Sequence, residues 1–401
     1  MKIMILGASI LQLPAIRQAK QMGLKVVVVD MNPNAIGFLE DGIESEVVST
    51  IDIPAVLKVA KKHGIEGVMT LASDMPIRTV AVVAKELGLV GISEDTAMKA
   101  TNKALMRDAL CEYGVPVPKY FKVSTKDEYK SIIQNFLSAF IVKPADNSGS
   151  RGIFLVSDHT DYELAMAAYD HSRKYSRNGE IVVEEYMQGP EVSVETISLN
   201  GLCHVIQITD KITTGAPHFV EMGHSQPSML TDIIKQKVAE VAIAANRALD
   251  IQNGPSHTEI IVTDEGPKIV ELGARLGGDF ITTHLVPLST GINMIESCIR
   301  IAMGEEPDLE IKDHFSSAIR YFPQRAGRIK RISGIGRAKQ MPGVIEIGVV
   351  HGEGEYITDV MDSTSRMGFV IAKSDTPISA IQICEKAIDC IKIEMEHKNE
   401  V

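Results

Sequence analysis

The stretch HTEIIVTDEGPKIVELGARLGGD, residues 257–279, contains two alternating polar and apolar segments around the turn signal DEGP. This pattern predicts a β-hairpin with strands at residues 259–263 and 268–272. Glu259 falls on the first strand and Glu271 on the second. In a tight antiparallel pair, these two carboxylates can lie near each other across the ladder and face the same side.

Two facing carboxylates beside an arginine predict a bound cation. Arg275 follows Glu271 just beyond the end of the second strand. Without a cation between them the carboxylates of Glu259 and Glu271 would repel each other, and Mg²⁺ commonly binds one or two carboxylates together with substrate phosphates. The alternative is a pair of exposed strand glutamates near a surface arginine, and the hairpin alone leaves both interpretations open.

Composition restricts the class of protein. A chain of 401 residues that is 45% hydrophobic and 23% charged is typical of a globular protein with about two or three domains. The formal charge of −11 argues against a general nucleic-acid binder. Five scattered cysteines without CxxC spacing predict reduced thiols, and we see no signal-peptide pattern and no apolar run of membrane-spanning length. These features predict a cytoplasmic protein with no membrane partner.

The first part of the chain alternates strands and helices. Residues 2–6 form an apolar run that ends in a glycine turn, and after a helical pattern a second strand, residues 25–29, ends at Asp30. Continued alternation predicts a doubly wound α/β domain. Only Gly7 of a G-x-G-x-x-G pattern is present, which supports a nicotinamide-dependent dehydrogenase poorly. Asp30 fits a turn cap as well as it fits a ribose-binding acid.

Three segments could face a phosphate-bearing ligand. Residues 71–74 lie at a strand end, where ligands of such sheets bind, although a polar turn with a helix cap is an equal alternative. Lys103 lies within a helix that we expect over residues 93–113. A strand delivers Lys143 to the loop 147–152, whose glycines let backbone amides crowd around phosphate oxygens and whose serines add hydroxyl donors. A flexible hairpin tip is the alternative for this loop.

The strand predicted at residues 181–185 ends in the segment EEYM. Its edge could offer backbone groups to a flat heteroaromatic ring, and Met187 could supply an apolar face beside that ring. Glu191 follows the next turn, where it could accept hydrogen bonds from ribose hydroxyls.

Residues 211–228 are expected to form a long loop, and such loops in compact domains tend to be functional or mobile. Lys211, His218, Glu221 and His224 lie in it. We favour substrate contacts or a lid over a metal site for the two histidines, because a helical HExxH pattern is missing.

Beyond residue 305 the chain alternates short strands with glycine turns and predicts a β-rich module. Strands are expected at residues 317–322 and 343–348, and a last helix at 377–394. His284, which precedes this region, is either a substrate contact or a buried histidine with satisfied hydrogen bonds.

Taken in order, Lys103, Lys143 before a Ser/Gly loop, a strand-end EEYM, and the pair Glu259 and Glu271 with Arg275 resemble the ATP-grasp superfamily. The resemblance implies mixed α/β and α+β architecture in three parts. These are an N-terminal doubly wound α/β domain (residues 1–98), an ATP-grasp domain (99–305) with a small lid subdomain (roughly 115–187), and a C-terminal β-rich ligase module (306–401).

The resemblance also implies roles for individual residues. Lys103 and Lys143 would contact the phosphates of ATP, and Ser148, Gly149, Ser150 and Gly152 would form the lid loop over them. Glu184, Glu185 and Met187 would form the adenine-binding edge, and Glu191 would bind the ribose. Glu259 and Glu271 would hold Mg²⁺, with Mn²⁺ as an alternative, while Arg275 and Lys211 are the catalytic candidates. One departure is visible, since the family pattern Glu-x-Asn-x-Arg reads Glu-Leu-Gly-Ala-Arg here, with Gly273 in place of the amide that normally helps hold the second metal.

The expected activity is that of an ATP-dependent carboxylate–amine ligase that forms an acyl phosphate and releases ADP and phosphate. Its partners would be a small carboxylate and a small amine, with a homodimer as the default assembly. The relatives that this resemblance implies are L-amino-acid ligases, phosphoribosylglycinamide synthetase and the carbamoyl-phosphate synthase large subunit. The alternatives are phosphoribosylamine–glycine ligase activity, carbamoyl-phosphate-synthase-like activity, or a catalytically weakened ATP-binding regulatory module.

Overall fold

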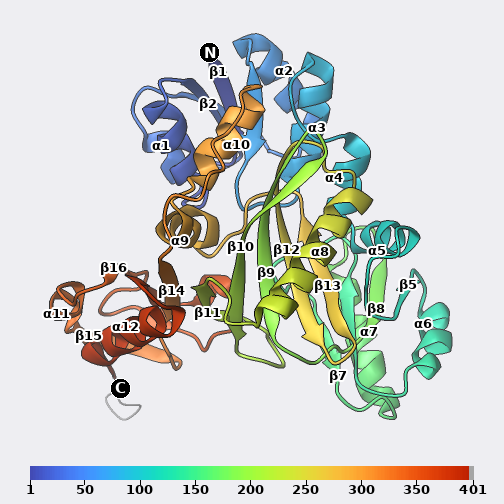
Figure 1. Cartoon of the computed structure of the whole chain (residues 1–401). Coiled ribbons are helices and arrows are strands. Elements are labelled where there is room, and N and C mark those ends of the chain that lie inside the picture. The colour runs from blue at the N-terminus through green and yellow to red at the C-terminus, as the bar shows by residue number, and fades with distance from the viewer. Residues whose placement is uncertain (397–401) are drawn as a thin grey trace.

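The computed structural model describes residues 1–396, and its N-terminal part is a parallel sheet with helices on both faces (Figure 1). The strand order is β3-β2-β1-β4. Alternate residues of β1 enter different cores, because Ile3 and Ile5 pack with α1 while Met4 and Leu6 pack with α2 and α3. The predicted doubly wound domain is therefore confirmed. Its elements are β1 (Lys2–Leu6), α1 (Leu13–Gln21), β2 (Lys25–Asp30), β3 (Glu44–Val47), α2 (Ile53–His63), β4 (Gly67–Thr70) and α3 (Pro76–Leu87).

Asp30 has a structural role at the end of β2. Its two carboxylate oxygens accept hydrogen bonds from the backbone amides of Ala8 and Asn32, each at 2.8 Å. These contacts hold together the turn after β1 and the turn after β2, which agrees with the turn-cap interpretation.

The single helix expected over residues 93–113 is wrong. The structure has two helices, α4 (Glu94–Thr101) and α5 (Lys103–Glu112), separated at Asn102. Asn102 leaves helical geometry with φ −134° and ψ 112°, and its side-chain oxygen accepts from two backbone amides of the following turn. This N-cap ends one helix and starts the next, so Lys103 is the first residue of α5.

A separate four-stranded antiparallel sheet, in the order β5-β8-β6-β7, carries the Ser/Gly loop. Its own apolar core includes Tyr129, Phe140 and Tyr169. Figure 1 shows this small sheet beside the central one. Its elements are β5 (Tyr120–Val123), α6 (Lys126–Ile132), β6 (Phe140–Pro144), β7 (Phe154–Val156), α7 (Tyr162–Tyr175) and β8 (Ile181–Glu185).

The central sheet has eight strands in the order β13-β12-β9-β10-β11-β14-β18-β16. Helix α8 (Asp232–Ala248) packs on it through Val238, Ala242 and Ala245, which join a core with residues of β9, β12 and β13. The strands are β9 (Glu191–Leu199), β10 (Leu202–Thr213), β11 (Glu221–Gln226), β12 (Gly254–Thr263), β13 (Gly266–Gly273), β14 (Ser316–Tyr321), β16 (Val344–Val349) and β18 (Gly368–Ser374).

The long loop expected over residues 211–228 is also wrong. Strand β10 continues through Lys211, and β11 pairs with it so that Lys211 lies opposite His224. Both side chains are buried, as are several other polar side chains of these strands. Polar side chains that face the interior remove the apolar alternation by which strands are recognised in a sequence. Of the singled-out residues, His218 lies in the connection between the two strands.

The C-terminal part continues the central sheet through β14, β18 and β16, and adds a small sheet in the order β17-β15-β19. The helix expected over 377–394 ends earlier, at Cys390, and β19 follows it. Ile393 and Met395 of β19 pair with β15, which explains the strand. The remaining elements are α9 (Val286–Thr290), α10 (Met294–Ala302), β15 (Gly327–Ser333), α11 (Ile335–Lys339), β17 (Tyr356–Ile357), α12 (Pro377–Cys390) and β19 (Lys392–Met395).

None of the helices in residues 1–396 combines the length and apolar character needed to cross a bilayer.

Candidate active site

The predicted hairpin forms from β12 and β13, and it places Glu259 directly opposite Glu271. A register shift follows immediately after Glu259. Both side chains are only partly exposed, at 23% for Glu259 and 29% for Glu271. The two carboxylates therefore project from adjoining strands at the edge of the central sheet, as the sequence predicts.

Lys103 connects the hairpin to the Ser/Gly loop. Its Nζ lies 2.8 Å from Oε1 of Glu271 and donates a 2.6 Å hydrogen bond to the carbonyl oxygen of Asn147. Its backbone amide donates to the carbonyl of Ala145 at 2.7 Å. Because the helix break at Asn102 makes Lys103 the first residue of α5, the side chain leaves the helix end toward the hairpin and the loop.

Lys143 belongs to a buried ion cluster. Its Nζ lies 2.6 Å from Oε2 of Glu184, and Arg107 binds the same carboxylate with Nε at 2.7 Å and Nη2 at 3.1 Å. Burial would raise the pKa of Glu184, but the charges of Arg107 and Lys143 outweigh it and lower the pKa to about 2. Burial lowers the pKa of Lys143, and the neighbouring charges of Arg107 and Lys103 act in the same direction. Anionic phosphate oxygens near Lys143 would oppose this effect.

Lys211 is surrounded by three carboxylates from three strands. Its Nζ lies 2.8 Å from Glu191, 3.1 Å from Glu259 and 3.3 Å from Glu221. Burial alone would lower the pKa of Lys211, but the three carboxylates hold it well above its usual range. Lys211 is thus fixed in its charged form beside one of the two predicted metal carboxylates.

Glu195 and His257 were not singled out in the sequence, yet they contact this group. Nδ1 of His257 lies 2.6 Å from Oε1 of the fully buried Glu195, and Nε2 lies 3.6 Å from Oε1 of Glu259. Burial would lower the pKa of His257, but Glu195 and Glu259 raise it to about 9. The sequence signal for such a pair is a charged or polar residue at a buried strand position, as in the segments SVET (193–196) and HTE (257–259).

Arg275 contacts the N-terminal domain. Its Nε donates to Oδ1 of Asp74 at 2.7 Å, and its Nη1 donates to the carbonyl of Leu276 at 3.2 Å. Burial would lower the pKa of Arg275, but Asp74, with Glu271 and Glu259, raises it above its ordinary value. Arg275 therefore remains a cation, and it feels the charge of both hairpin glutamates.

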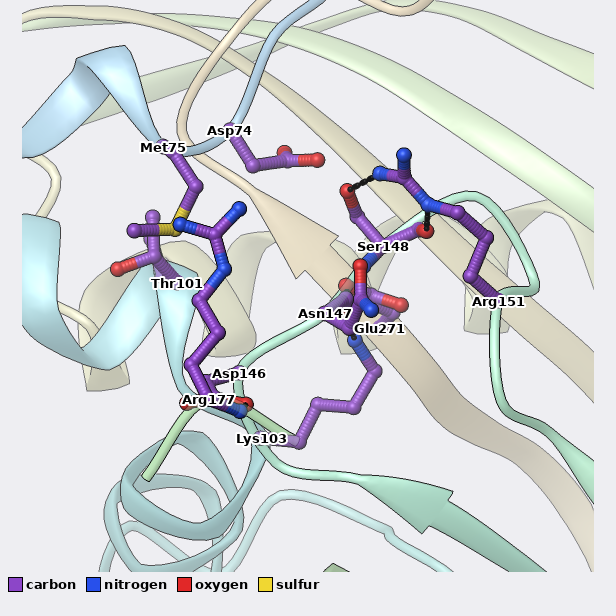
Figure 2. A pocket seen from close by; sticks show the side chains of 11 residues that line it. Asp74, Met75, Thr101, Lys103, Asp146, Asn147, Ser148, Arg151, Arg177 and Glu271 are labelled. Carbon is purple, nitrogen blue, oxygen red and sulfur yellow. Dashed lines mark hydrogen bonds and ion pairs between the residues drawn. The ribbon is translucent and has the colours of Figure 1, made fainter. Parts of the chain in front are cut away.

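A pocket opens between Lys103, Glu271, Ser148 and Asp74, which come from four separate segments (Figure 2). Figure 2 also shows Arg151 bound back onto Ser148, with its Nε donating to the backbone carbonyl at 2.9 Å. The other residues that line the pocket are Met75, Ala100, Thr101, Asp146, Asn147 and Arg177. Three basic side chains (Lys103, Arg151 and Arg177) and three carboxylates (Asp74, Asp146 and Glu271) line this pocket, so its lining has no excess of either charge.

The loop 147–152 has the conformation that its glycines permit. Gly149, Ser150 and Gly152 adopt positive φ angles of 65°, 58° and 81°. A Cβ at Gly152 would lie 2.5 Å from Cβ of Tyr175, so only glycine fits that position. The predicted contact of this loop with phosphates stays a prediction.

The acids of the EEYM segment are engaged by cations. The Glu184 carboxylate is held by Arg107 and Lys143, and Glu185 lies 2.8 Å from Nζ of Lys268. The predicted adenine contacts of Glu184, Glu185 and Met187 therefore depend on backbone groups and on the Met187 side chain.

A second polar cluster lies where the C-terminal part meets the central sheet. Arg366 binds both carboxylate oxygens of Asp279 at 2.7 Å, and Nε2 of His224 lies 3.3 Å from the same carboxylate. The Arg366 guanidinium also stacks on the ring of Tyr321 at 3.7 Å. Asp279 and Arg366 are far apart in the sequence and carried no recognisable motif. His284 is about a third exposed; its Nδ1 lies 2.8 Å from Oγ1 of Thr283 and its Nε2 lies 3.3 Å from Glu346. Both ring nitrogens thus have partners although the ring is only partly buried, and the substrate contact stays a prediction.

The donor set fits a metal that is shared with a nucleotide. Within residues 1–396 no group of three or more acidic, histidine or cysteine side chains is arranged to hold an ion alone. Glu259 and Glu271 supply two carboxylates, and Mg²⁺ usually completes such a site with phosphate oxygens and water. Because Lys211 and Lys103 contact these carboxylates, a metal would have to compete with their ammonium groups.

Comparison with known proteins identifies two regions. An ATP-grasp domain model matches residues 137–283, and an L-amino acid ligase C-terminal domain 2 model matches residues 320–396. The first match contains the Ser/Gly loop, the EEYM segment and the hairpin, and the second contains most of the C-terminal part.

Individual relatives agree with these matches. The chain is 30% identical over 290 residues to the alanine–anticapsin ligase of Bacillus subtilis (strain 168). This alignment covers 66% of this chain and 59% of the ligase. It is 26% identical over 308 residues to the L-arginine-specific L-amino acid ligase of Bacillus subtilis, with 75% and 72% covered. The crystal structure of an L-amino acid ligase from Bacillus licheniformis superposes with a TM-score of 0.86 at 24% identity, over 99% of both chains, and shares the fold.

Proposed function

The chain belongs to the ATP-grasp ligases, ATP-dependent enzymes that form C–N bonds, and we propose that it joins the carboxylate of one amino acid to the amino group of a second amino acid. The names of the two relatives, an alanine–anticapsin ligase and an L-arginine-specific L-amino acid ligase, support this substrate class. The reaction converts ATP to ADP and phosphate.

The proposed chemistry has two steps. A carboxylate oxygen attacks the γ-phosphorus of ATP, the bond to the β–γ bridging oxygen breaks, and ADP leaves from an acyl phosphate. The amine nitrogen then attacks the acyl carbon, the C–O bond to phosphate breaks, and the amine loses a proton as the amide forms. Both steps bring anions together, so positioning and charge neutralisation are the main tasks of the protein.

The site residues suit these tasks. Lys103 and Lys143 would neutralise the phosphates, and Arg275 would bind the oxygens of the acyl phosphate and the transition state. Mg²⁺, held by Glu259 and Glu271, would neutralise charge on the transferred phosphoryl group. Closure of the loop 147–152 would exclude water, which would otherwise hydrolyse the acyl phosphate.

One observation carries the proposal. The Lys103 ammonium joins Glu271 on the hairpin to the carbonyl of Asn147 at the start of the Ser/Gly loop. The predicted metal carboxylate, the predicted phosphate lysine and the predicted lid loop therefore meet at one point, as a Mg-ATP site requires.

Measuring ADP release tests the proposal. Purified protein with Mg-ATP is given the standard amino acids singly and in pairs, and products are identified by mass spectrometry, with Lys143→Met as the inactive control. We expect specific pairs to stimulate ADP release and to yield a dipeptide of the matching mass. ATP binding without stimulation by any pair would contradict the proposal and favour the regulatory module that the substitution at Gly273 suggests. A further reaction contains glycine and phosphoribosylamine. If this pair is the only one that stimulates ADP release, the alternative activity of a phosphoribosylamine–glycine ligase is assigned.

A further inference from the structure

We propose that Asp74 is a positioning residue that the N-terminal domain contributes to Arg275, and that its carboxylate lies against the space that a side chain at position 273 would enter. The proposal rests on the proposed function, because it concerns the guanidinium that would bind the acyl phosphate. It assigns a part in the reaction to a domain that otherwise precedes the ATP-binding region.

The contact between the two residues is short and shielded from solvent. Nε of Arg275 lies 2.7 Å from Oδ1 of Asp74, and the side chains are only 17% and 13% exposed. Burial would raise the pKa of Asp74, but Arg275 and Lys103 lower it, so the carboxylate is charged. Together with the bond from Nη1 to the Leu276 carbonyl, this contact fixes the plane of the guanidinium.

Gly273 lies beside the contact between Asp74 and Arg275 and places no side chain against it. A Cβ built on Gly273 would lie 3.3 Å from Oδ1 of Asp74 and 3.4 Å from both Cζ and Nε of Arg275. The first distance is slightly tighter than an ordinary van der Waals contact and the other two lie at its lower limit, so a side chain at position 273 would press on the Asp74 carboxylate. Gly273 does not have a positive φ, so its backbone does not require glycine. Glycine at this position therefore leaves the contact between Asp74 and Arg275 undisturbed.

Asp74 is itself held in place. The Gln12 amide nitrogen donates to the carbonyl of Leu71 at 2.6 Å and to Oγ of Ser73 at 3.2 Å. The backbone carbonyl of Asp74 accepts from the amide of Ile77 at 3.0 Å at the start of α3. Figure 2 shows the Asp74 side chain extending from this segment into the pocket that Ser148 lines from the other side. These bonds thus hold the backbone segment from which the Asp74 side chain extends.

The arrangement gives Asp74 a defined task. A guanidinium bound at Nε by a fixed carboxylate is restricted in rotation, and a group that is already oriented contributes more to a transition state. Asp74 and Gly273 form a matched pair, because a side chain at position 273 would press on the Asp74 carboxylate that holds Arg275.

Steady-state kinetics of Asp74→Asn and Asp74→Ala test the positioning role. We expect kcat for amino-acid-dependent ADP release to fall about 10-fold to 100-fold, the usual effect of removing a supporting hydrogen bond. The KM for ATP should change less than about two-fold, a split that general destabilisation would not produce. Asp95→Asn, which removes an exposed carboxylate of α4 paired with Lys99, is the matched control and should leave kcat unchanged. An unchanged kcat in both Asp74 variants would overturn the proposal.

The cycle of Gly273→Asn, Asp74→Ala and the double variant tests the matched pair. We expect Gly273→Asn to lower both kcat and Tm, and the added Asp74→Ala to restore part of the lost Tm because it removes the carboxylate that the amide would meet. If the change in Tm of the double variant equals the sum of the changes in the two single variants, the pairing is contradicted. The Tm cycle requires no turnover, so it still decides the pairing if the wild-type protein releases no ADP, a result that would count against the proposed function alone.

Discussion

Nζ of Lys103 lies 2.8 Å from Oε1 of Glu271, although the two residues are 168 positions apart in the chain. The first residue of a helix and the second acid of a hairpin are thereby joined at the pocket that also contains the Ser/Gly loop. This contact links the hairpin carboxylates with a lysine that is predicted to contact phosphate, and the sequence-based hypothesis depended most on these two features.

Replacing Lys103 with methionine should weaken the use of ATP. The change removes the cation between Glu271 and the loop carbonyl, so phosphate charge is less well neutralised. We expect kcat/KM for ATP to fall at least about 100-fold, measured by coupled ADP release. Lys99→Met, which removes a partly exposed lysine of the neighbouring helix α4 that pairs with Asp95, is the control and should behave as the wild type. Equal activity of the two variants would argue against a role for Lys103.

Acid should destabilise the protein through Glu184. Its pKa is about 2 in the folded protein and is lowered from an ordinary value of 4.5, so its ionisation stabilises the fold above pH 4.5. That stabilisation is lost as pH falls from 4.5 toward 2. Glu184→Gln should cost about 3–5 kcal/mol of unfolding free energy at pH 7, because Arg107 and Lys143 lose their shared counter-charge. Urea unfolding of both proteins between pH 3 and 7 should give converging stabilities at the acid end, and parallel curves would contradict this account.

Removing the Lys211 charge should destabilise the protein more at alkaline pH than at acid pH. In Lys211→Met the carboxylates of Glu191, Glu221 and Glu259 would face one another without a cation. The pKa of Glu259, which Lys211 helps to hold well below its usual range, would then rise. The variant should be less stable than the wild type at pH 8, and the difference should shrink as pH falls and Glu259 gains a proton in the variant. Thermal unfolding across this range measures the difference, and a constant deficit at every pH would oppose the explanation.

Removal of Mg²⁺ should abolish most of the stabilisation by ATP. A nucleotide at about 100 times its Kd stabilises a protein by about 2.7 kcal/mol, which appears as a rise in Tm. We expect EDTA to remove most of this rise, and Glu259→Gln or Glu271→Gln to weaken its dependence on Mg²⁺. A rise in Tm that is equal with and without metal would show that these glutamates do not act through a cation.

The sequence predicted the parts of the fold that depend on local pattern. Alternating residues and a turn signal located the β12–β13 hairpin, and the pairing of Glu259 with Glu271 followed from it. The strand at Lys211 was missed, because buried polar residues interrupt the apolar alternation. The helix break at Asn102 carried a signal in the N-cap residue itself, although the surrounding periodicity concealed it.

Contacts between distant segments could not be predicted in this way. The Glu195 carboxylate meets His257, and Asp279 meets Arg366, only because the central sheet and the C-terminal part bring them together. The segment 71–74 was predicted to face a ligand on topological grounds, but its specific partner, Arg275, follows from tertiary structure alone. Fold class and the hairpin carboxylate pair were thus accessible from the sequence, while the buried partners of these groups were not, and the phosphate-facing roles stay predictions.

Transfer of an isotopic label tests the central claim most directly. An amino acid substrate labelled with ¹⁸O in its carboxylate is incubated with the protein, Mg-ATP and the amine, and the released phosphate is analysed by mass spectrometry. If the carboxylate attacks the γ-phosphoryl group, one ¹⁸O must appear in each phosphate formed with the amide. Phosphate without the label, released together with amide, would contradict the acyl-phosphate mechanism.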